Sequence, residues 1–196
     1  VLNTFFSQLD GCVPLENVLV LYATNRPEML DSGFTRAGRT DEIIEIPTPN
    51  RRTAKAILNS YLARGLPLAG ENNSDDLAAR IVSRLFAPNG EYAKVAEAKL
   101  SDGSCLPVAG RQLISGAMLE NVVKFAAKQA AVRESQTGQE GITEQDLASL
   151  LDAELVSAVS LLVPANLKSY VTSIPQDAQP VAVDRLLVSP SSTYTR

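Results

Sequence analysis

The chain has 196 residues, 45% of them hydrophobic, so it can form one ordinary domain or two small ones with a real core. Its apolar runs are far shorter than the ~20 residues that cross a bilayer, and it opens without a signal peptide, so we expect no membrane partner. A net charge of −4 argues against nucleic acid as the main partner, and the absence of histidine excludes a Ser-His-Asp triad and histidine metal ligands. Two cysteines far apart in sequence, Cys12 and Cys105, are typical of the free thiols of a cytoplasmic protein.

The first fifty residues have the pattern of the end of an α/β domain. Residues 1–11 carry apolar side chains at helical spacing, which predicts the last part of an amphipathic helix. Val18–Ala23 is a continuous apolar run and predicts a strand buried on both faces of a parallel sheet. After a polar, turn-rich stretch, Glu42–Ile46 predicts a second, shorter strand that Pro47 closes.

Beyond residue 50 the pattern becomes helical. The apolar spacing predicts four helices, over 51–64, 75–86, 115–134 and 143–155. Between the second and third helices, residues 91–109 predict a β-hairpin, because Asp102-Gly103 is a strong turn signal. Thr143 and Asp146 have the spacing of a capping box at the start of the fourth helix.

The periodicity weakens after residue 160, where prolines interrupt it. Val181–Val188 predicts a short strand, and Ser189–Arg196 predicts a disordered end. The sequence therefore predicts the end of an α/β domain to about residue 47, then a small helical domain with an inserted hairpin, and then a C-terminal extension.

Polar and basic side chains follow the first predicted strand. Asn25 comes directly after Val18–Ala23, at the edge where open α/β sheets bind ligands, and its amide can orient a water against a phosphate. Arg36 and Arg39 lie on a glycine-containing turn, and their planar charged groups suit phosphate oxygens. Alone, Asn25 would be read as a turn former and the two arginines as surface residues. Together, at this spacing, they favour a phosphate site.

The stretch from Ala23 to Asp41 resembles the second region of homology of AAA+ ATPases. The resemblance implies that Asn25 is the sensor-1 residue. It also implies that Arg36, and with less support Arg39, is an arginine finger that reaches into the ATP site of the neighbouring subunit. A finger of this kind contributes on the order of 10³–10⁵ in rate. Ala37 stands where the family usually has proline.

The helix start Ser115-Gly116-Ala117 resembles the sensor-2 position of the AAA subfamily, which has Gly-Ala there. The resemblance implies that the backbone at Gly116 and Ala117 approaches the nucleotide, as tiny residues at a helix N-terminus allow. A plain N-cap at Ser115 is the alternative. Ile57 matches a family residue that packs on the adenine, and an ordinary core position is its alternative.

The hairpin and the following Leu113–Lys128 look like the ARC and bacterial proteasomal ATPases. This likeness implies three parts. Residues 1–49 would be the C-terminal part of an AAA+ α/β nucleotide-binding domain, residues 50–160 a helical lid that contains the hairpin, and residues 161–196 a C-terminal extension. The likeness also implies a hexameric ring that uses ATP and Mg²⁺ to unfold protein substrates. Some members of the family deliver these substrates to a proteasome. The proteasome-docking members end in a Gly-Gln-Tyr-Leu-like tail, from which Ser191–Arg196 differs.

Two ATPase motifs are missing from the sequence. No segment fits the Walker A loop Gly-x-x-x-x-Gly-Lys-[Ser/Thr]. The acidic pair of a Walker B strand, expected shortly before the helix at residue 1, is absent from these 196 residues as well. The first residue is not methionine, so we expect a fragment or a processed chain. Its Walker motifs and Mg²⁺ ligands would lie upstream, and alone it would neither bind ATP tightly nor hydrolyse it. Two alternatives stay open: an AAA+ remodeller of another complex without a proteasome, and a non-catalytic scaffold protein with decayed ATPase features.

Overall fold

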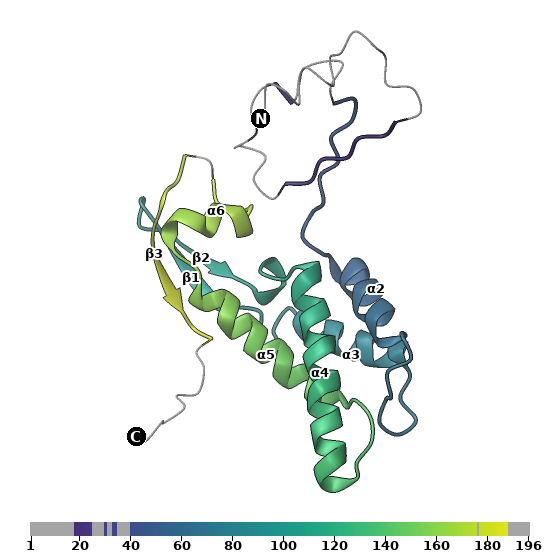
Figure 1. The fold of residues 1–196 in the computed structure, drawn as a ribbon. Coiled ribbons are helices and arrows are strands. Elements are labelled where there is room, and N and C mark those ends of the chain that lie inside the picture. Colours follow the sequence, from purple (N-terminus) through teal and green to yellow (C-terminus); the bar gives the residue numbers. More distant parts are fainter. Residues whose placement is uncertain (1–17, 25–29, 31–32, 35–39, 176, 188–196) are drawn as a thin grey trace, which may run out of the picture. The chain divides into compact units, whose positions relative to one another are not determined.

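The computed structural model describes residues 18–24, 30, 33–34, 40–175 and 177–187 (Figure 1). The chain divides into two compact units, which we call unit 1, Val1–Pro47, and unit 2, Thr48–Arg196. All the helices and strands of the described residues belong to unit 2.

Unit 1 differs from the expectation of two strands. The described residues 18–24 and 42–47 carry no regular secondary structure. Their apolar side chains are exposed, for example 82% at Leu21 and 90% at Ile46. A strand that is buried on both faces is stable only inside a sheet with helices over it, and the described sheet of the chain lies in unit 2. These segments have the apolar composition of buried strands, but the two predicted strands are not formed in the described residues.

Unit 2 contains the four predicted helices. They are α2 (Arg51–Leu62), α3 (Ser74–Leu85), α4 (Gly116–Thr137) and α5 (Glu144–Ser160). Three short helical segments join them to the rest: η2 (Gly110–Gln112), η3 (Pro164–Asn166) and α6 (Leu167–Tyr170). In Figure 1, α4 lies between α2 and α5, and contacts both.

Polar side chains begin the four long helices where the sequence places them. The Asn50 side chain accepts hydrogen bonds from the amides of Arg52 and Thr53 at 3.0 Å, which satisfies two of the free N–H groups at the start of α2. Asn73, Ser115 and Thr143 cap α3, α4 and α5, respectively, and each side chain accepts a hydrogen bond from one backbone amide. The capping box predicted from Thr143 and Asp146 is confirmed.

The hairpin predicted over 91–109 is also confirmed, as β1 (Ala96–Leu100) and β2 (Cys105–Val108). The two strands are antiparallel, with Ala96 opposite Val108 and Lys99 opposite Cys105. A third strand, β3 (Pro180–Arg185), pairs antiparallel with the other edge of β1 and gives the order β2-β1-β3. The strand expected near Val181–Val188 therefore forms, and it ties the C-terminal segment to the sheet of unit 2.

One hydrophobic core joins these helices to the sheet. Its fully buried side chains come from every long helix and from the hairpin and include Leu58, Leu62, Leu77, Ile81, Leu85, Val108, Leu119, Leu147, Leu151 and Leu155. Each helix presents its apolar face inward, as the sequence periodicity predicts.

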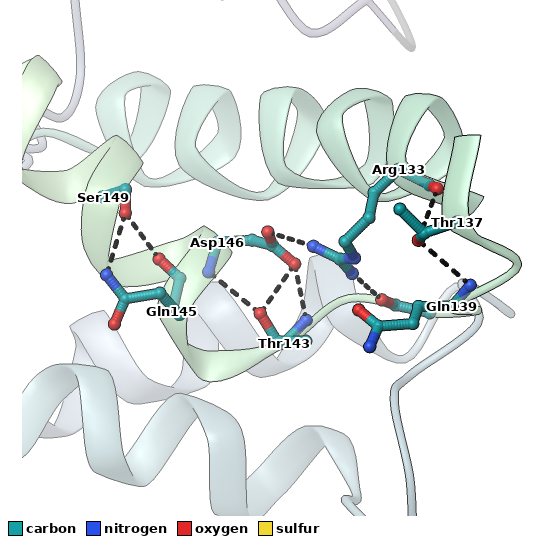
Figure 2. A network of polar contacts seen from close by, with 8 residues as sticks. Arg133, Thr137, Gln139, Thr143, Gln145, Asp146 and Ser149 are labelled. Carbon is teal, nitrogen blue, oxygen red and sulfur yellow. Dashed lines mark hydrogen bonds and ion pairs between the residues drawn. The ribbon is translucent and has the colours of Figure 1, made fainter. Parts of the chain in front are cut away.

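The connection between α4 and α5 is held by a polar network (Figure 2). Arg133 on α4 donates to the Asp146 carboxylate and to the carbonyl of Gly141. The same carboxylate accepts from the backbone N–H and the hydroxyl of Thr143, both at 2.8 Å. Ile142 then forms a parallel bridge with Leu68, so the loop is fastened on both sides.

Among the described residues, no single helix has the length and apolar composition to cross a membrane. In that described part of the chain, α5 and the segment Pro164–Tyr170 together have a suitable length and composition, but the pair is bent by 104°. The apolar face of α5 belongs to the core described above.

Candidate functional site

The N-terminus of α4 is held in place by the residues that precede it. Leu113 and Ile114 are buried in the core and anchor the chain just before the helix. The Ser115 hydroxyl then accepts a hydrogen bond from the Met118 amide at 3.1 Å. The N-cap reading of Ser115 is therefore correct, and it is compatible with a ligand at the same helix end.

Gly116, the first residue of α4, faces open space. A Cβ built on Gly116 would meet no atom within 4 Å, and Ala117 beside it is exposed. The first N–H groups of a helix have no partner within the helix, and the dipole makes this end partly positive. With small residues at Gly116 and Ala117, an anion can approach these amides directly.

Ile57 lies on α2, which packs against α4 (Figure 1). Its side chain is partly buried against the core, between the fully buried Ala54 and Leu58. The structure therefore gives Ile57 a core contact and leaves part of its surface free. A role against an adenine ring stays a prediction.

A hydrogen bond that the sequence analysis missed joins α2 to α4 near these residues. The Tyr61 hydroxyl donates to a carboxylate oxygen of Glu120 at 3.1 Å. The guanidinium carbon of Arg64 lies 4.3 Å from the centre of the Tyr61 ring, a cation–π distance. The only signal in the sequence was that Tyr61 follows Ile57 by four residues on the same helix face, and nothing in it pointed to Glu120.

The other three predicted site residues, Asn25, Arg36 and Arg39, lie outside the described residues. Nearby, the Thr40 hydroxyl donates to the Phe34 carbonyl at 2.6 Å. The roles of Asn25, Arg36 and Arg39 stay predictions.

The groups with shifted pKa values lie in structural networks of unit 2. Burial, with a hydrogen bond to Asp152, raises the pKa of Tyr92, and a hydrogen bond to Glu91 raises the pKa of Arg84. Burial by itself raises the pKa of Asp146, but hydrogen bonds from Arg133 and Thr143 outweigh it and hold that pKa below its usual value. These networks hold helices together. The groups that the start of α4 offers to a ligand are its backbone N–H groups.

Within the described part of the chain, no cluster of three or more cysteine, aspartate or glutamate side chains could hold a metal ion. A shallow hollow of about 320 Å³ runs along α4, lined by Lys128, Gln129, Val132, Arg133 and Gln136. It lies about three turns beyond Gly116, so it does not belong to the open end of α4.

Two family models match the chain and together cover nearly all of it. The model described as "ARC, AAA+ ATPase lid domain" matches residues 49–193. The model described as "ATPase family associated with various cellular activities (AAA)" matches residues 1–48. The first match contains all the helices and strands of unit 2, and the second contains the segment with Asn25, Arg36 and Arg39.

The curated relatives carry two kinds of name. An "AAA ATPase forming ring-shaped complexes" of Kocuria rhizophila is 33% identical over 165 residues, which is 79% of this chain and 28% of the relative. A "Proteasome-associated ATPase" of Thermomonospora curvata is 34% identical over 156 residues, 72% of this chain and 26% of the relative. An "AAA ATPase forming ring-shaped complexes" of Corynebacterium kroppenstedtii is 33% identical over 178 residues, which is 85% of this chain and 31% of the relative. The chain thus spans less than a third of the length of these relatives.

Proposed function

Because this chain belongs to the ARC family of AAA+ ATPases, we propose that it supplies the second half of an ATP-hydrolysing module in a ring-shaped protein unfoldase. The open, capped N-terminus of α4 carries this proposal, because it offers free amides at Gly116 and Ala117 in a lid-type fold. Ile57 on the adjacent α2 would contact the adenine.

The remaining roles rest on the family match to residues 1–48. Asn25 would orient the attacking water at the γ-phosphate of its own subunit. Arg36, with Arg39, would stabilise the transition-state charge in the site of the next subunit. ATP and Mg²⁺ would be held mainly by Walker motifs that these 196 residues do not contain.

The assembly we propose is a homo-oligomeric ring, hexameric by family likeness, that couples ATP hydrolysis to the unfolding of protein substrates in the cytoplasm. The names of the relatives favour two versions of this task, since some are called proteasome-associated and others only ring-forming. Stimulated degradation of a folded substrate by added proteasome core particles would support the first version. Unfolding without any such stimulation would support the second.

The direct test of the proposed function is ATP turnover by the full-length protein that contains this chain. We expect Arg36→Ala to lower turnover by roughly 10³-fold or more. Arg111→Ala, which removes an exposed arginine of unit 2, is the control and should leave turnover unchanged. If Arg36→Ala leaves turnover intact, Arg36 is not an arginine finger. If the unmodified full-length protein shows no ATP turnover at all, the non-catalytic scaffold reading is correct instead.

A further inference from the structure

Two helices that carry proposed nucleotide contacts are joined by one side-chain hydrogen bond. The Tyr61 hydroxyl on α2 donates to Glu120 on α4 at 3.1 Å. Arg64 lies against the ring of Tyr61, with its guanidinium carbon 4.3 Å from the ring centre. The ring is therefore held by contacts on its face and at its hydroxyl.

The position of this bond within each helix is informative. Tyr61 follows Ile57 by four residues, and Glu120 follows Gly116 by four residues. Residues four apart in a helix are neighbours on one face. The bond is therefore anchored one turn from each proposed nucleotide contact, on the same face of its helix.

The bond contributes little to holding the fold together. Contact between α2 and α4 is already provided by the hydrophobic core, in which Leu58, Leu62 and Leu119 are fully buried. Glu120 is exposed to solvent, and a hydrogen bond at such a position adds little net stability. It adds a directional contact between α2 and α4 to these apolar ones.

We propose that Tyr61 and Glu120 are positioning residues for adenine nucleotides. Their hydrogen bond sets the spacing between Ile57, which packs on the base, and the start of α4, whose amides approach the rest of the nucleotide. This inference rests on the proposed function of the same site. It adds that nucleotide affinity depends on a contact between two side chains that do not touch the nucleotide.

The test is steady-state ATP hydrolysis by the full-length protein, with KM and kcat measured separately. Tyr61→Phe keeps the ring and removes the hydroxyl, so we expect KM for ATP to rise roughly 2- to 10-fold with kcat changed less than about 2-fold. Glu120→Ala should raise KM by the same factor. Glu120→Gln keeps an oxygen that can accept the hydrogen bond, so its KM should stay near that of the unmodified protein.

Two further variants separate positioning from general effects. The double variant Tyr61→Phe with Glu120→Ala should raise KM no further than either change alone, because both remove one interaction. Tyr170→Phe removes a hydroxyl from α6, away from α2 and α4, and should leave KM unchanged.

The outcomes distinguish this inference from the function on which it rests. If Ile57→Ala raises KM while Tyr61→Phe and Glu120→Ala do not, the positioning role is wrong and the proposed site stands. If Ile57→Ala and Tyr61→Phe both leave KM unchanged, the proposed site itself is wrong. Additive effects of Tyr61→Phe and Glu120→Ala would also overturn the inference, since the two residues would then act separately.

Discussion

At the scale of single residues, the α4–α5 loop shows how tightly backbone geometry can restrict a sequence. Gly141 has a φ of 84°, and its carbonyl accepts a hydrogen bond from Arg133. A Cβ on Gly141 would lie 2.5 Å from the Ala69 amide nitrogen and from the Leu68 carbonyl carbon. Only glycine fits here, for reasons of both conformation and space.

We therefore expect Gly141→Ala to destabilise unit 2 by at least about 2 kcal/mol, since it adds a backbone clash to an unfavourable φ. Gly138→Ala is the matched control. Its φ of 72° is similarly unfavourable, but an added Cβ meets no atom within 4 Å, so the cost should be only about 1 kcal/mol. Denaturant unfolding of the chain, followed by circular dichroism, measures both. Equal costs for the two variants would show that the close approach of the two loops is not present in solution.

Asp146 gives a prediction about pH. Its pKa is lowered in the folded chain, so its contribution to stability is present above the unfolded value of about 3.9 and is lost as pH falls through the lower folded value. Asp146→Asn should cost about 1–3 kcal/mol at neutral pH, because Arg133 and Thr143 lose a charged acceptor. The difference in unfolding free energy between the two proteins should stay constant above about pH 5 and shrink below about pH 4. Urea titrations from pH 7 to pH 2 test this, and a difference that does not change with pH would contradict it.

At the scale of elements, local signals in the sequence were sufficient to predict the four long helices and the hairpin of unit 2. The Asp102-Gly103 turn places the hairpin, and Thr143 with Asp146 places the start of α5. Both act between residues that are close in sequence. The pairing of β3 with β1 and the bond from Tyr61 to Glu120 join residues far apart, and no short-range pattern reports such contacts.

Unit 1 shows the opposite case. Val18–Ala23 has the composition of a buried strand, yet the described residues of this segment are exposed and form no strand. An apolar run predicts a buried position, but burial depends on the elements that surround it. The family match to residues 1–48 assigns this segment to an AAA domain, which agrees with the sequence pattern. The site residues Asn25, Arg36 and Arg39 were predicted by family likeness and stay predictions.

A buried tyrosine links three parts of unit 2 and gives a prediction at this scale. The fully buried Tyr92 follows α3 and donates its hydroxyl to Asp152 on α5, while Arg84 of α3 lies 3.8 Å from the same carboxylate. Asp152→Ala leaves that hydroxyl without its acceptor, so it should cost about 1–3 kcal/mol. Tyr92→Phe should cost less, because the half-exposed Asp152 can bind water and still faces Arg84.

Thermal or denaturant unfolding compares the two variants, with Asp152→Asn as the control that keeps an acceptor oxygen and should be mild. A larger cost for Tyr92→Phe than for Asp152→Ala would mean that the hydroxyl is not buried against α5 as described.

At the scale of the whole molecule, the proposed ATP site takes its parts from more than one segment of the chain and from more than one subunit. The 196 residues contain no Walker A loop, whose backbone amides and lysine hold the phosphates of ATP in P-loop enzymes. We expect the isolated chain to show no ATP turnover above background and to bind ATP only weakly. Phosphate release and equilibrium dialysis with the purified chain measure these two properties. Sustained turnover by the chain alone would show that another part of it holds the phosphates.

The central claim is that Asn25 acts in the ATP site of its own subunit and Arg36 in the site of the next. It is tested most directly by mixing two variants of the full-length protein, Asn25→Ala and Arg36→Ala, each inactive as a uniform ring. In a mixed ring, an Arg36→Ala subunit keeps its own Asn25 and receives an intact arginine from an Asn25→Ala neighbour. Random mixing in equal amounts makes about a quarter of the junctions complete, so ATP hydrolysis should reappear at roughly that fraction of the normal rate. If energy transfer between labelled subunits shows that mixed rings form and they stay as inactive as the parents, the two residues do not serve different subunits and the account is wrong.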